Sequence, residues 1–167
     1  AAWRSGMRLR DEQSGELRHF KEQKGMAYSQ IFRPADAPAW VLDRQRLWNE
    51  VERAEMRINS QLARLVVVAL PVELLESQQI ELVSKWVGDQ FLREKMIADV
   101  NIDTRKQSNP HAQIMLTTRE VGLDGWAKKK NRDWGKKPLL LKWRESWAKS
   151  TNLALEAAGH DVRIDHR

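Results

Sequence analysis

Two neighbouring segments constrain the fold of this 167-residue chain more than any other feature. In "MIADVNID", residues 96–103, apolar side chains from Met96 to Ile102 alternate with polar ones that end at Asp103. This period of two predicts a β-strand with one apolar face. A second strand is expected over residues 111–119, after a short polar loop that contains Pro110. A loop of this length favours an antiparallel hairpin over a parallel crossover.

Other segments predict a further strand and two helices. "LVVVAL", residues 65–70, is apolar and rich in β-branched residues, and it stops at Pro71, which predicts a central strand buried on both faces. Residues 40–58 place apolar side chains three and four positions apart, as in an amphipathic helix. Ser77 is the expected N-cap of a second helix that runs to about Arg93.

A last helix is expected over residues 138–158, with Pro138 in its first turn and Gly159 at its end. Its expected inward-facing residues are Leu140, Trp143, Trp147 and Ala154. The preceding segment, residues 120–137, is rich in glycine and lysine and is expected to be a mobile loop over one end of the sheet. These elements predict an α+β fold, an antiparallel sheet with helices packed mainly on one face and the other face open.

Length and composition narrow the class of protein. The chain is long enough for one core, so residues 1–167 are expected to form a single domain. It has no cysteine, which excludes disulfides, thiolate catalysis and cysteine-ligated metals. No apolar stretch reaches the roughly 18 to 20 residues of a membrane span, and the N-terminus has no signal-peptide core, so a cytoplasmic protein is expected.

The chain carries a formal net charge of +6, which favours a polyanionic partner. Residues 122–149 alone account for this excess. Within them, "GWAKKKNRDWGKK" interleaves tryptophans, which offer stacking surfaces, with cations that neutralise phosphates, as expected for single-stranded DNA. The alternative is a lysine-rich loop with both indoles packed beneath it. The candidate DNA-binding residues are Trp126, Lys128, Lys129, Lys130, Arg132, Trp134, Lys136 and Lys137.

A candidate metal site lies on the expected hairpin. His111 and Gln113 are two positions apart on one strand and therefore share a face, and antiparallel pairing brings Asp103 beside them. An imidazole, a carboxylate and an amide oxygen suit Mn²⁺ or Mg²⁺ better than structural zinc. The alternative is a strand whose polar face meets solvent.

Several ordered motifs resemble the MobA/MobL relaxases of plasmid mobilisation. They are "AAWRSG" at 1–6, "GMAYSQIFRPADAPAW" at 25–40, "ALPVEL" at 69–74, "NPHAQIMLTTRE" at 109–120 and "LEAAGHDVRIDHR" at 155–167. The resemblance implies a palm-like fold of the histidine-hydrophobic-histidine (HUH) superfamily and strand-specific nicking of DNA at an origin of transfer. In that chemistry a tyrosine becomes joined to the 5′ end of the DNA while a histidine-bound divalent metal polarises the phosphate. Accessory mobilisation proteins are the partners that it implies.

The chain departs from the family pattern at its chemical positions. The family tyrosine falls on Trp3, which has no hydroxyl, and the family histidines fall on Asp103, His111 and Gln113, of which one is unchanged. Glu73 resembles an acidic residue near the metal, although a solvated carboxylate is equally expected there. The family's first strand, just before the "AAYRSG" motif, is missing, so the sequence is expected to be a truncated domain.

Three hypotheses follow from these departures. The first is a domain that binds origin DNA with nicking weakened or lost through Trp3. The second is a metal-dependent nickase that uses Tyr28, within an expected strand "MAYSQIF", or a metal-activated water. The third is a noncatalytic regulatory or assembly protein that retains only the fold. Arg4 and Arg119 are further candidates for phosphate contacts, or else surface arginines in salt bridges.

Overall fold

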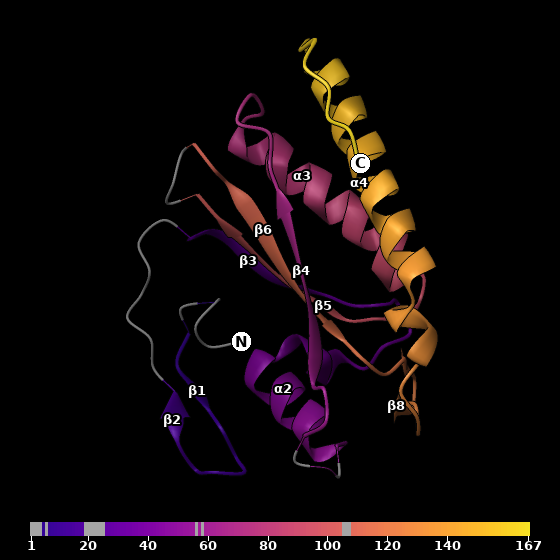
Figure 1. Ribbon diagram of the computed structural model, residues 1–167. Coiled ribbons are helices and arrows are strands. Elements are labelled where there is room, and N and C mark those ends of the chain that lie inside the picture. The colour runs from indigo at the N-terminus through magenta and orange to yellow at the C-terminus, as the bar shows by residue number, and fades with distance from the viewer. Residues whose placement is uncertain (1–4, 6, 19–25, 56, 58, 105–107) are drawn as a thin grey trace.

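A four-stranded antiparallel sheet forms the centre of the structure, a computed structural model that describes residues 5, 7–18, 26–55, 57, 59–104 and 108–167 (Figure 1). In spatial order its strands are β3 (Met26–Phe32), β5 (Ala98–Asp103), β6 (His111–Thr117) and β4 (Ala63–Ala69). Two short antiparallel pairs lie outside it, β1 (Leu9–Arg10) with β2 (Leu17–Arg18) and β7 (Val121–Gly122) with β8 (Gly125–Trp126).

The expected hairpin is confirmed as the centre of this sheet. Strands β5 and β6 pair antiparallel, from Ala98 opposite Leu116 to Asp103 opposite His111. The apolar residues of β5 join the main core, as their alternation predicts. The polar side chains on the other face of β5 are also buried, with Asp99 at 0% and Asn101 at 3% exposure. The alternative of a strand whose polar face meets solvent therefore does not describe β5.

Strand β4 lies at an edge of the sheet, so its expected central position is wrong. Among the described strands it pairs with β6 alone. Leu65 and Val67 are 45% and 55% exposed, whereas Val66 and Val68 contact the main core. The continuous apolar run predicted burial on both faces because both faces of β4 are apolar, but helices cover only one of them.

Helices α3 (Glu76–Val87) and α4 (Lys137–Ala157) cover one face of the sheet (Figure 1). Their contact is rich in edge-on aromatic pairs, with the rings of Trp86 and Trp147 at 4.9 Å and those of Phe91 and Trp143 at 5.0 Å. Such rings bury large apolar areas, so this layer holds most of the core.

The two helix ends correct details of the prediction. Ser77 is not the N-cap of α3; Leu75 occupies that position, and its N–H donates to the Gln78 side chain at 2.8 Å. A π-turn, η2 (Gly88–Leu92), continues α3 towards Arg93. In α4, Trp143 and Trp147 face inward as expected, but Leu140 is 44% exposed.

Helix α2 (Arg44–Arg53) lies against part of the other face and forms a second apolar cluster that includes Leu47 and Val51. The expected helix over 40–58 is thus divided. A 3₁₀ turn, η1 (Ala39–Leu42), precedes Asp43, whose carboxylate caps α2 by accepting the N–H of Arg46 at 3.0 Å. The far end of that prediction includes Ile58, which lies outside the described residues.

Residues 120–137 were expected to form a mobile loop, but they contain regular structure. They contain the β7–β8 hairpin and the 3₁₀ turn η3 (Arg132–Gly135), with the Trp134 side chain in the main core. The predicted class, an α+β fold with an antiparallel sheet and helices mainly on one face, is confirmed. Only α2 departs from it, by covering part of the face that was expected to be open.

Candidate functional site

Strand register places three expected metal ligands on one face of the sheet. Asp103 lies opposite His111, and Asn101 lies opposite Gln113. Paired residues project on the same side of an antiparallel sheet, here the side away from α3 and α4. His111 and Gln113 are partly exposed, and the residue Asp103 is 6% exposed.

The imidazole of His111 is oriented by its neighbours. Its Nδ1 lies 3.1 Å from the carbonyl oxygen of Asn109, so Nδ1 carries the proton and donates to that oxygen. Its Nε2 then accepts from the Gln113 amide, 3.3 Å away. In this tautomer the lone pair of the ring is on Nε2, and a nitrogen with a lone pair can bind a metal.

The donor set fits a hard or borderline divalent cation. Rotation of the Gln113 amide presents its oxygen beside His111 Nε2, because the two ends of an amide occupy nearly the same space. With the Asp103 carboxylate across the pair, the face offers one nitrogen and two kinds of oxygen, as Mn²⁺ accepts. Among the described residues, no group of three His, Asp or Glu side chains could hold a metal. A metal site built from the described residues of this face therefore depends on the amide of Gln113.

A buried ion pair beside this face was missed by the sequence analysis. Asp99 accepts from Arg44 Nε at 3.0 Å and Nη2 at 2.9 Å, and from the indole N–H of Trp48 at 2.9 Å. Arg44 and Trp48 are four positions apart on α2 and thus share a helix face. That spacing was the only signal available, because their partner lies far away in the sequence.

A chain of hydrogen bonds extends from this ion pair along the sheet. Asn101 Nδ2 donates to Asp99 at 3.3 Å, and Asn101 Oδ1 accepts from the Ser29 hydroxyl at 2.7 Å. Both polar ends of Asn101 are therefore occupied, and its side chain is fixed beside Gln113 on the candidate face.

Tyr28 lies on the opposite face from His111. It sits in a strand as expected, but its pairing with Ile102 directs its ring towards the main core. Its hydroxyl donates to the Gln30 side chain. The sheet itself separates this hydroxyl from the candidate metal ligands, which argues against Tyr28 as the nucleophile.

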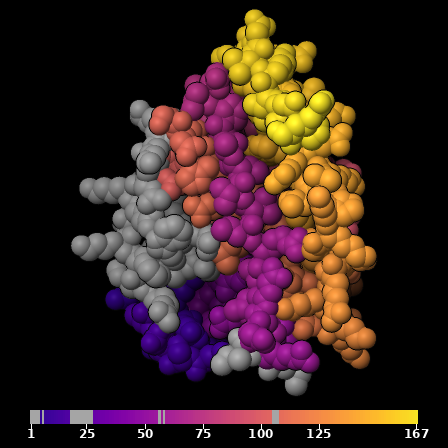
Figure 2. Space-filling model, in the orientation of Figure 1, coloured from indigo at the N-terminus to yellow at the C-terminus, as the bar shows by residue number. Residues whose placement is uncertain are grey.

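Glu73 lies in an exposed turn after β4 and lines a groove of about 630 Å³ between β4 and α4. Val162 and Ile164 of the C-terminal segment line the same groove. Figure 2 shows this side of the molecule, with α4 in orange beside β4 in purple. This position suits the solvated carboxylate, which was one of the two expectations for Glu73.

Residues 125–137, here called the basic segment, meet β6 at the end that lies far from His111. Its residue Asn131 donates its N–H to the carbonyl oxygen of Thr118, just after β6. The seven residues of β6 span roughly 20 Å at about 3.3 Å each. The segment therefore does not border the candidate metal ligands directly.

Two of the expected phosphate contacts serve a buried carboxylate instead. Glu55, with a side chain 6% exposed, is 3.0 Å from Arg119 Nε and 3.0 Å from Lys130 Nζ. Burial raises the pKa of Glu55, but hydrogen bonds from Lys130 and Arg119 outweigh it, so that the pKa is lowered. Arg119 also donates to the carbonyl oxygens of Ala54 and Lys128, so it joins α2 to the basic segment.

The two tryptophans of the segment are packed. Trp134 is 4% exposed, and Trp126 packs on the second cluster with its ring edge-on to Trp40 at 5.8 Å. Both indoles pack against the protein and neither stands out from its surface, so the alternative of packed indoles describes them better. The exposed cations of the segment are Lys128, Lys129, Arg132, Lys136 and Lys137. The remaining candidates, Trp3 and Arg4, lie outside the described residues.

Comparisons with known proteins agree with this fold. The model of the MobA/MobL family matches residues 1–167. A probable conjugal transfer protein TraA from Sinorhizobium fredii is 31% identical over 100% of this chain and 18% of the relative. The mobilization protein MobL of Acidithiobacillus ferridurans is 28% identical over 100% of this chain and 52% of the relative. Mobilization protein A of Escherichia coli is 35% identical over 72% of this chain and 19% of the relative.

A solved structure shares the whole architecture. It is described as "Molecular Basis of Vancomycin Resistance Transfer in Staphylococcus aureus" and matches with a TM-score of 0.92 and 31% identity, over 99% of this chain and 88% of that chain. The chain spans 18% of the length of the TraA relative, so it corresponds to one part of such a protein. None of the helices in the described ranges is long and apolar enough to cross a membrane.

Proposed function

Because the chain belongs to the MobA/MobL family, we propose that it is a relaxase-type domain that binds single-stranded DNA at an origin of transfer during plasmid mobilisation. The matched relatives are named for mobilization or conjugal transfer. The exposed lysines of the basic segment support the choice of partner, since they supply the sequence-independent phosphate contacts on which DNA affinity depends.

The observation that carries the proposal is the shared face of His111, Gln113 and Asp103. A divalent cation held there would polarise a backbone phosphate of the DNA. His111 would supply Nε2, held in place by its bond to Asn109, and Gln113 and Asp103 would supply oxygens. The change from the family's histidines to an aspartate and a glutamine leaves fewer nitrogen ligands, and we expect weaker binding of transition metals.

The proposal includes impaired nicking. Trp3 stands where the family has its tyrosine, and an indole cannot form a phosphotyrosyl bond. Tyr28, the only tyrosine of the chain, has its ring on the opposite face of the sheet. DNA binding without a covalent intermediate is therefore the activity that these residues favour.

A covalent-adduct assay tests the proposal. The probes are single-stranded oligonucleotides that tile the origin of transfer of the element encoding the protein, with Mn²⁺ present. We expect the parent protein to bind one of them without forming an adduct on a denaturing gel. Trp3→Tyr should form the adduct, and Trp3→Phe, the matched control, should not. An adduct formed by the parent, or no binding of any probe, would contradict the proposal.

The metal site has its own readout. Titration with Mn²⁺ should show an affinity at least about 10-fold lower for His111→Ala than for the parent. Gln113→His should bind more tightly, because it adds an imidazole to the face. If Trp3→Tyr binds Mn²⁺ and DNA normally but forms no adduct, the ligand changes and not Trp3 are the main defect.

A further inference from the structure

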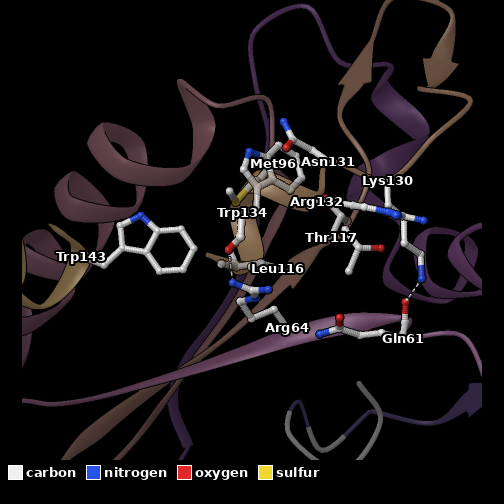
Figure 3. Close-up of a pocket in the computed structure, with 12 residues that line it drawn as sticks. Gln61, Arg64, Met96, Leu116, Thr117, Lys130, Asn131, Arg132, Trp134 and Trp143 are labelled. Atoms are coloured by element: carbon white, nitrogen blue, oxygen red, sulfur yellow. Dashed lines mark hydrogen bonds between the residues drawn. The ribbon is translucent and has the colours of Figure 1, made fainter. Parts of the chain in front are cut away.

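A small pocket opens where the basic segment meets the end of β6 and the start of α4 (Figure 3). Its volume is about 200 Å³. Its floor is apolar, built from Met96, Leu116, Trp134 and Trp143. Its rim carries three cations, Arg64, Lys130 and Arg132. This pocket, here called the ring pocket, lies at the other end of β6 from His111 and is distinct from the candidate metal ligands.

The size of the ring pocket restricts its ligand. A cavity of about 150 Å³ holds a benzene molecule, while sites for drug-sized ligands have about 300 Å³ or more. The ring pocket therefore fits one planar six-membered ring with its substituents. The indoles of Trp134 and Trp143 form part of the apolar surface on which such a ring would pack.

The polar groups of the lining are mostly engaged within the protein. The Thr117 hydroxyl accepts from the Ile97 N–H and donates to the Arg119 carbonyl oxygen. The Asn131 side chain accepts from the Asp133 N–H and donates to Glu120. The pocket thus offers shape and apolar contact to a ring, with little hydrogen-bond readout of its edges.

The rim favours an anion beside that ring. Lys130 is shared between Glu55 and the carbonyl oxygen of Gln61, and Arg64 donates to the carbonyl oxygen of Trp134. Arg132 is exposed, and no hydrogen bond or ion pair engages it among the described residues. Its guanidinium is the group best placed to bind a phosphate at the mouth of the pocket.

We propose that the ring pocket takes one pyrimidine base of a bound DNA strand, with a flanking phosphate on Arg132. This inference rests on the proposed function, since the strand is the one that the basic segment binds. The pocket accepts a planar six-membered ring, and the cations of the rim bind an anion. A pyrimidine base with its flanking phosphate combines the two. The lack of edge readout makes the site selective for the presence and size of a base more than for its identity.

Binding of two 12-residue oligonucleotides, measured by fluorescence anisotropy, tests the proposal. One is oligothymidylate and the other an abasic strand with the same phosphates. We expect the parent protein to bind oligothymidylate about 10-fold more tightly, as one stacked base provides. Thr118→Phe, which fills the pocket from its rim, should bring this ratio close to one and leave the affinity for the abasic strand unchanged. Lys129→Ala is a matched control on the same segment but outside the pocket lining. It should weaken the binding of both oligonucleotides by the same factor.

Each other outcome counts against a definite claim. Equal binding of the two strands by the parent, or a ratio that Thr118→Phe leaves unchanged, would overturn the ring pocket while DNA binding stands. Failure to bind either strand would overturn the proposed function and this inference with it. Displacement of oligothymidylate by thymidine monophosphate at similar concentrations would assign the pocket to free nucleotides instead. If Thr118→Phe lowers the melting temperature, Gln61→Phe, at an exposed rim position, repeats the test.

Discussion

Glu55 is the residue at which three separate parts of the chain meet. It follows α2, Arg119 follows β6, and Lys130 belongs to the basic segment. A buried carboxylate that accepts hydrogen bonds from two cations is held in its charged form. Loss of this one charge would leave both cations without their common partner.

We predict that Glu55→Gln lowers the free energy of unfolding by about 2 kcal/mol at pH 7, the scale of a hydrogen bond to a charged group. The lowered pKa of Glu55 means that the unfolded chain binds its proton more readily, so the stabilisation is complete above the ordinary value of 4.5. It is lost as the pH falls through the lower value of the folded state. Urea unfolding of parent and variant at pH 7 and at pH 3 measures both limits.

Glu52 supplies a control of opposite sign. Burial, followed by the charge of Asp11, raises the pKa of Glu52. The charged form of this carboxylate is therefore less favourable in the folded state than in the unfolded chain. Glu52→Gln should therefore leave stability unchanged or slightly higher at pH 7. A loss at pH 7 as large as that of Glu55→Gln would contradict this assignment of the two residues.

Sequence patterns reached some residues of the candidate site and not others. The common face of His111 and Gln113, and the position of Asp103 across from His111, follow from the period of two and a short loop, both of which are local properties. The bond between Arg44 and Asp99 joins positions 55 residues apart. No local pattern specifies such a contact, because it depends on how α2 lies against the sheet.

Among the elements, α4 shows how one residue fixes a helix end. Gly159 follows the helix with φ of +80°, a left-handed conformation that side chains with a Cβ rarely adopt. A Cβ built there would meet no atom within 4 Å, so backbone strain is the only cost of a substitution. The sequence predicted this end correctly because a helix often ends at a residue in the left-handed conformation, and glycine adopts that conformation most easily.

We predict that Gly159→Ala lowers the free energy of unfolding by about 1 kcal/mol. Thermal unfolding followed by circular dichroism measures the change. Gly88→Ala is the matched control, since Gly88 has helical backbone angles and also open space around a built Cβ. It should be neutral or stabilising, and equal losses at both positions would refute the role of the left-handed conformation.

The errors at the element scale share one physical reason. An apolar run shows that the side chains of a strand are hydrophobic, but it does not show whether other elements cover one face or both. For this reason β4 was expected at the centre of the sheet, whereas it lies at an edge. Likewise, a segment rich in lysine and glycine was expected to be mobile, yet Trp134 attaches it to the core. In both cases tertiary contacts decided what local composition could not.

At the scale of the whole molecule, the ion pair between Arg44 and Asp99 joins α2 to the sheet. Both side chains are buried, at 7% and 0% exposure, and Trp48 donates to the same carboxylate. Burial of an unpaired charge is costly. Because the fold buries both Arg44 and Asp99, each of them needs the other as its partner. It therefore fixes how the second apolar cluster sits against the strands.

We predict that Asp99→Ala costs about 3–5 kcal/mol, because it leaves the Arg44 charge buried and alone. The double variant Arg44→Met with Asp99→Leu should cost less than this single change, although it removes both members. Guanidinium unfolding provides both values. Asp89→Ala is the control, since the pair of Asp89 with Arg93 is exposed and should contribute less than about 0.5 kcal/mol.

The strand order also governs how the chain is made in the cell. Strands β3 and β4 lie at opposite edges of the sheet, and among the described strands they pair with β5 and β6 respectively, which come later in the sequence. A ribosome releases the N-terminal part first, so β3 has no partner until Asp103 has left the exit tunnel, and β4 has none until Thr117 has left it. Until then the apolar run of β4 stays uncovered on the nascent chain. This interval is when molecular chaperones have most reason to bind it.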